Sequence, residues 1–108
     1  MFSVNGTTIT MINKDTANIE ITVEDHTFVS GDKAYFTVKK SLDVTETLIH
    51  KEITTFDGNS FIINLTTTDT DLEPDTYKYD IQLNLSDGRV DTVIGPANFV
   101  INKGVTEV

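Results

Sequence analysis

Apolar and polar residues alternate along much of the chain, in stretches that turn-forming residues separate. The clearest stretch covers residues 77–85, where every odd position is apolar or aromatic and every even position is polar. Because successive side chains of a strand point to opposite faces, this alternation predicts a strand with one buried face. Residues 16–24 and 33–40 alternate in the same way and predict two further strands of this kind.

Two glycine-containing pairs predict tight hairpins near the start and the middle of the chain. Asn5-Gly6 is the stronger signal, because a type I′ turn needs positive φ at both central residues. It predicts a small hairpin or strand within residues 2–12. Asp57-Gly58 predicts a second hairpin, which leads into a strand over 61–65.

The remaining segments predict an edge strand, a corner and a final pair of strands. Neither face of residues 46–55 is purely apolar, which is typical of an edge strand defended by charge. Residues 66–76 are rich in Thr and Asp and predict a corner or one helical turn. Asp87-Gly88 predicts a tight turn into residues 90–94. Gly95-Pro96 predicts a bend or bulge before the last strand.

These elements together predict one all-β domain over residues 1–108. Short strands with turn signals at intervals of about 8–12 residues are typical of an immunoglobulin-like sandwich or a small barrel. We predict an immunoglobulin-like β-sandwich of about seven to eight antiparallel strands, whose two sheets bury their apolar faces against each other. A helical fold is disfavoured, since Ala occurs only at positions 17, 34 and 97 while Thr, Val and Ile are plentiful.

Composition and charge exclude several classes of partner and chemistry. The chain has no Cys, which removes disulfides, thiolate nucleophiles and Cys-ligated metals, and favours assembly in a reducing cytoplasm. Its formal charge is −9, and Arg89 is the sole arginine, so we predict no nucleic-acid partner. The one basic pair, Lys39-Lys40, is interpreted as the end of a strand rather than as a phosphate site.

Membrane insertion and secretion have no sequence signal. No apolar run approaches the length of about 20 residues that spans a bilayer. Residues 1–15 lack a charged region followed by an apolar one, so we expect no secretory signal and no membrane partner.

The sequence predicts no enzyme. Catalysis requires a nucleophile, a base and an orienting group that converge in one pocket, and no motif predicts such a set. His26 lies in a loop and His50 in mid-strand, and we interpret both as solvated polar positions. We therefore predict no catalytic residue and no cofactor-binding or metal-binding residue. A hydrolase with an Asp/Glu pair is disfavoured because Trp, which often lines sugar sites, is absent.

The pattern of the segment from Asp69 to Asp75 is compatible with two roles, Ca²⁺ binding and turn capping. Its carboxylates are spaced by two residues, as oxygen ligands are in calcium loops. The central Gly and closing Glu of an EF-hand-like loop are absent. We therefore favour turn capping, in which Asp and Thr side chains bond to local backbone N–H groups, over Ca²⁺ binding.

Three segments resemble a known family of phage proteins. These are Thr8 to Val23, Gly31 to Lys40, and Leu72 to Leu83 with the following Asp87 to Thr92. The sequence is similar to the N-terminal domain of tailed-phage baseplate upper proteins and to related small prophage structural proteins. The resemblance covers roughly residues 8–101 and depends mainly on strand and turn patterns.

The resemblance implies an immunoglobulin-like sandwich that helps to build a phage tail tip or baseplate. Its partners would be other tail or baseplate proteins, with a homo-oligomer as a possible form, and its location the virion, after assembly in the bacterial cytoplasm. Two turn positions depart from the family: Asn13-Lys14 replaces Arg-Gly, and Asp75 replaces the Gly that precedes Thr-Tyr. The family carries no catalytic residues that can be transferred to this chain.

Two residue-level hypotheses accompany this interpretation. Tyr77 lies where immunoglobulin-like domains often place a tyrosine whose hydroxyl ties down the preceding loop, and Tyr79 would then be a core residue. Tyr35 lies on the polar face of its strand and supports an alternative function, a free-standing carbohydrate-binding or adhesin module. We expect a non-enzymatic structural component that acts through protein–protein association.

Overall fold

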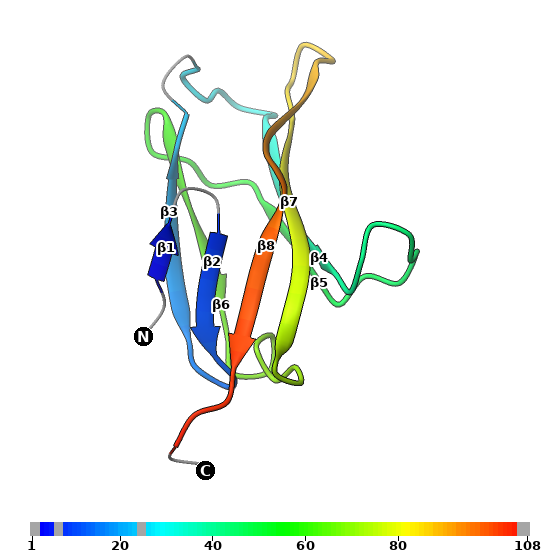
Figure 1. The fold of residues 1–108 in the computed structure, drawn as a ribbon. Helices are drawn as coiled ribbons and strands as arrows, with labels where there is room; N and C mark the ends of the chain where they lie inside the picture. The colour runs from blue at the N-terminus through cyan, green and yellow to red at the C-terminus, as the bar shows by residue number, and fades with distance from the viewer. Residues whose placement is uncertain (1–2, 6–7, 24–25, 106–108) are drawn as a thin grey trace.

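The computed structural model describes residues 3–5, 8–23 and 26–105, and this part of the chain contains strands and turns but no helix. The all-β prediction is therefore confirmed, and the number of strands falls within the predicted range. Figure 1 shows the arrangement of the strands. They are β1 (Ser3–Asn5), β2 (Thr8–Ile12), β3 (Ala17–Thr22), β4 (Lys33–Lys39), β5 (Ile49–Ile53), β6 (Ser60–Leu65), β7 (Asp75–Asn84) and β8 (Val90–Asn102).

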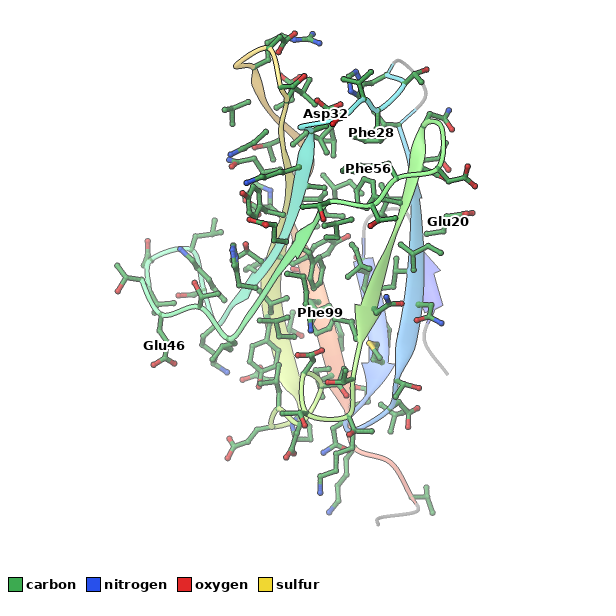
Figure 2. All side chains as sticks on the ribbon, turned by 180° about the vertical axis from the view of Figure 1, so that it is seen from behind. Glu20, Phe28, Asp32, Glu46, Phe56 and Phe99 are labelled. Carbon is green, nitrogen blue, oxygen red and sulfur yellow. The ribbon has the colours of Figure 1, made fainter. Side chains whose placement is uncertain are left out.

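The strands form two sheets of unequal size. The large sheet has six strands in the order β1-β2-β8-β7-β4-β5, and the small sheet pairs β3 with β6. The small sheet lies behind the large one in Figure 1 and in front of it in Figure 2. The segment between β4 and β5 projects from the side of the molecule (Figure 1).

The prediction that all strands are antiparallel is wrong for one pair. β2 runs parallel to β8, with Ile9 opposite Phe99 and Met11 opposite Ile101. Alternation of side chains is the same in parallel and antiparallel strands, so it carries no information on direction. These two strands are separated by most of the chain, which provides the long crossover that a parallel pair needs.

The second predicted hairpin is also wrong. β5 pairs with β4 at the edge of the large sheet, as its charged pattern predicted, whereas β6 pairs with β3 in the small sheet. The connection over residues 54–59 therefore crosses between the sheets. Asp57-Gly58 does reverse the chain, but only locally: the backbone N–H groups of Asp57 and Ser60 each donate to the other's carbonyl oxygen, at 2.9 and 3.0 Å.

The other two predicted hairpins are confirmed. β1 and β2 are antiparallel, although the side chain of Asn5 and residues 6–7, which contain the predicted turn, lie outside what the structure describes. β7 and β8 are antiparallel, and the connecting turn places Gly88 at a φ of 94°. β8 continues past Gly95-Pro96 as one strand, with the predicted bulge opposite Asp80.

The alternating residues of both sheets meet in one hydrophobic cluster. Phe36 and Phe99, from the centre of the large sheet, are fully buried with ring centroids 6.1 Å apart. Each fully buried side chain of this size contributes roughly 1.5–3 kcal/mol to folding. Ile81 and Leu83 are buried as their pattern predicts. The small sheet contributes Ala17, Ile19, Phe61, Ile63 and Leu65.

Candidate interaction surfaces

His26 is not the solvated residue that we expected. Its Nε2 lies 2.9 Å from Oδ2 of Asp32, and its ring packs edge-on against Phe28 with centroids 4.9 Å apart. Asp32 is 3% exposed and also accepts hydrogen bonds from the backbone N–H groups of Val29, at 2.9 Å, and Ser86, at 2.8 Å. These backbone donors, followed by His26, hold the pKa of Asp32 far below its usual range. Asp32 and its partners have a structural role, because they join the loop that contains His26 to the loop that contains Ser86.

The other histidine lies on the outer face of the large sheet. His50 Nδ1 is 3.0 Å from Thr37 Oγ1, and its ring stacks on that of Tyr35 with centroids 5.6 Å apart. The Tyr35 hydroxyl donates to Glu52 at 3.0 Å. That hydrogen bond, together with partial burial and the charge of Glu52, raises the pKa of Tyr35. The two histidines share no partner among these contacts.

Two carboxylates of the segment from Asp69 to Asp75, those of Asp69 and Asp75 themselves, make contacts within the protein. The Thr66 N–H donates to Asp69 Oδ2 at 2.8 Å, and the Asp69 N–H donates to Thr66 Oγ1 at 3.2 Å, so the predicted turn capping is confirmed. Lys51 Nζ lies 2.7 Å from Asp69 and ties the turn to β5. Asp75 pairs with Lys40. Among the described residues, no group of three or more His, Cys, Asp or Glu forms a candidate metal site.

Two buried polar contacts fix the ends of the strands. The Tyr77 hydroxyl donates to the Glu73 carbonyl oxygen at 2.6 Å, which confirms the predicted tie to the preceding loop. Thr70 is fully buried and donates to the Asp15 carbonyl oxygen at 2.6 Å. Thr70 had no signal in the sequence, because its acceptor lies in a distant segment.

The outer face of the large sheet carries a shallow polar depression with a volume of about 400 Å³. We call it the outer-face depression. Its groups include a phenol, an imidazole and two side-chain amides, all of which form hydrogen bonds readily. It is lined by Tyr35, Thr37, Lys39, His50, Asp80, Gln82 and Asn84. Lys39 ends β4, as the prediction for the basic pair states.

A larger groove, of about 510 Å³, lies where the chain crosses from β5 to β6. We call it the edge groove, because β5 and β6 are both edge strands of their sheets. Phe56 lines it and stacks on Phe28, with centroids 4.1 Å apart; Figure 2 labels both rings. Its lining residues are Glu20, Lys51, Glu52, Ile53, Thr54, Thr55, Phe56, Asp57, Ser60, Phe61, Ile62 and Asn64. Sequence patterns missed the groove, since it combines residues from different sheets.

In the described part of the chain, no helix has the length and hydrophobicity to cross a membrane. No family model, no curated protein and no solved structure matches this chain.

Proposed function

We propose that this chain is a non-enzymatic structural component of a phage or prophage tail or baseplate, built as an immunoglobulin-like sandwich. The strand order supports the fold part of this proposal. One sheet joins β8, β7, β4 and β5, the other pairs β3 with β6, and immunoglobulin domains divide their strands between two sheets in a comparable way. The Tyr77 hydrogen bond matches the tyrosine corner of such domains.

The turn before β3 supports the resemblance to baseplate upper proteins. Lys14 stands where that family has Gly, and it has a φ of 67°, in the left-handed region that Gly adopts most readily. The Lys14 N–H donates to the Thr70 carbonyl oxygen at 3.1 Å, which helps to hold this conformation. The turn therefore has the left-handed conformation that Gly favours, although residue 14 is Lys.

The edge groove is the observation that carries the function. It opens along a strand edge, and such edges are ready templates for pairing with another chain. A structural component of a larger assembly needs a surface of this kind. The groove is the largest of the surface hollows described above.

Mass spectrometry of purified virions from the source phage or prophage tests the proposal. We expect the chain in the particles at a fixed copy number relative to the tail proteins, and cross-linked to at least one of them. The chain's absence from intact particles that contain all other tail proteins would overturn the proposal.

The outer-face depression favours a second candidate function, carbohydrate binding. The Tyr35–His50 stack presents ring surface beside amide and carboxylate groups, a combination that binds sugar hydroxyls and apolar sugar faces. A glycan array would then show a ligand whose binding Tyr35→Ala abolishes while the fold is retained. An array without any ligand rejects this candidate.

A further inference from the structure

The free edge of β6 presents backbone groups that a further strand can pair with. The Val23 N–H donates to the Asn59 carbonyl oxygen at 2.9 Å, which makes 23 and 59 a hydrogen-bonded pair. Hydrogen-bonded pairs alternate along an antiparallel ladder, so residues 61, 63 and 65 of β6 bond to β3. The N–H and C=O groups of Ser60, Ile62 and Asn64 therefore point away from β3.

Two of these three residues have backbone groups available. Ser60 uses its outward N–H and C=O in the local turn with Asp57. β6 pairs with no strand other than β3 in the described residues, which leaves the outward groups of Ile62 and Asn64 facing the edge groove. Both residues line that groove, and Ile62 is 49% exposed.

The two edges that flank the groove differ in their protection. β5 carries Lys51 and Glu52, and charge on an edge strand opposes pairing with other chains. β6, with the sequence SFIINL, carries no charged residue. An uncharged strand edge that lies beside apolar side chains, here Ile53 and Phe56, is suited to the addition of another strand.

The charge of the groove indicates the kind of strand that fits. Glu20, Glu52 and Asp57 line the groove, whereas its one basic residue, Lys51, is already paired with Asp69 at 2.7 Å. A second copy of this chain, with its formal charge of −9, would be repelled. A strand with Lys or Arg would be attracted.

We propose that the edge groove binds an extended, basic segment of a different protein, which adds to β6 as a third strand of the small sheet. Its backbone pairs with Ile62 and Asn64, its inward side chains are apolar and cover Ile53 and Phe56, and its outward side chains are basic. The choice of a different protein rests on the proposed function, in which the domain acts by binding other chains.

Binding of a peptide of about nine alternating lysines and valines tests this pairing, since strands are usually about 3–10 residues long. We expect the peptide to protect the Ile62 amide from hydrogen exchange. A glutamate/valine peptide of the same length should bind at least about tenfold more weakly at low salt, and added salt should weaken the lysine peptide.

Asn18 and Asn64 offer a matched pair of variants. They are paired in register and both exposed, but their outward backbone groups lie on opposite edges of the small sheet. Asn64→Pro removes an N–H from the groove edge and should weaken peptide binding at least about tenfold. Asn18→Pro makes the same change at the other edge and should alter binding less than about twofold.

Three outcomes would overturn the proposal: equal binding of the two peptides, equal effects of the two proline variants, or an Ile62 amide that stays unprotected. A dimer of this chain that Asn64→Pro dissociates would also overturn it, since the occupant would be a second copy. If Asn64→Pro fails to fold, Ile62 protection in the wild-type chain still decides. These measurements do not depend on the virion measurement, so the proposal of strand addition and the proposed tail function can be rejected separately.

Discussion

Tyr77 connects the start of β7 to the preceding loop through a single hydrogen bond, from its hydroxyl to the Glu73 carbonyl oxygen. The ring is buried, and burial together with the charge of Glu73 raises the pKa of this hydroxyl above its usual value. The position of Tyr77 at the start of a late strand, where immunoglobulin-like domains often place such a tyrosine, predicted a tie to the preceding loop but not its acceptor.

Tyr77→Phe should lower the free energy of unfolding by about 1 kcal/mol, because it leaves the Glu73 carbonyl oxygen without this donor. Urea denaturation measures the change. Tyr35→Phe is the control: its hydroxyl bonds to Glu52 at an exposed position, so the loss should be smaller. Equal losses in the two variants would show that the Tyr77 bond has no special role.

Other polar residues that fix loops could not be predicted. No pattern in the sequence marked Asp32, yet it is buried and bonds to Ser86. Thr70 bonds to Asp15 across an equally long stretch of chain. Residue type alone does not show such partners, because they depend on which loops the fold brings together.

At the scale of the elements, the bulge in β8 requires a glycine. Gly95 has a φ of 119°, and a Cβ atom there would lie 2.6 Å from the Asp80 Cβ and 2.9 Å from the Tyr79 carbonyl oxygen. Both neighbours belong to the central strand β7, which has little freedom to move aside. The sequence predicted the bend, but not which strand it presses against.

Gly95→Ala should therefore destabilise the protein by at least about 2 kcal/mol, through backbone strain and overlap with β7. Gly58→Ala provides the comparison, since Gly58 also has a positive φ of 64° but no atom within 4 Å of the added Cβ. Its cost should be about 1 kcal/mol. Thermal unfolding of both variants checks the order, which would be contradicted if Gly58→Ala were the more harmful.

Alternation predicted the strands well and their partners poorly. The buried faces of β4 and β7 match the predicted positions because period-two patterning reports burial directly. The same pattern does not indicate which other strand a strand pairs with. Hence the Asp57-Gly58 turn suggested a β5–β6 hairpin, although β6 pairs with β3. The edge groove was unpredictable for the same reason, since it exists only because β5 and β6 separate.

At the scale of the whole molecule, carboxylates in three separate turns favour the folded state at neutral pH. The pKa of Asp32 and that of Asp87 are lowered chiefly by backbone hydrogen bonds. For Asp69, burial opposes ionisation, but hydrogen bonds from Lys51 and Thr66 outweigh it and lower the pKa. A lowered folded-state pKa means that the unfolded chain binds more protons on acidification.

Stability should therefore be at its full value above the ordinary carboxyl pKa of about 4 and should fall as the pH drops below it. Unfolding midpoints between neutral pH and pH 3 measure this fall. Asp32→Asn should reduce the midpoint at neutral pH and make its dependence on acid shallower, because residue 32 no longer titrates. An unchanged slope would show that Asp32 does not contribute.

The parallel pairing of β2 with β8 has a consequence for synthesis of the chain. β8 lies between β2 and β7, so the hairpin of β1 and β2 has no contact with the rest of the large sheet until β8 has been synthesised. Until then Ile9 and Met11, which are 2% and 1% exposed in the folded protein, lack their neighbours in β8, Phe99 and Ile101. The large sheet can therefore be completed only once β8 has emerged from the ribosome, which makes the β2–β8 pairing a late step in the folding of this domain.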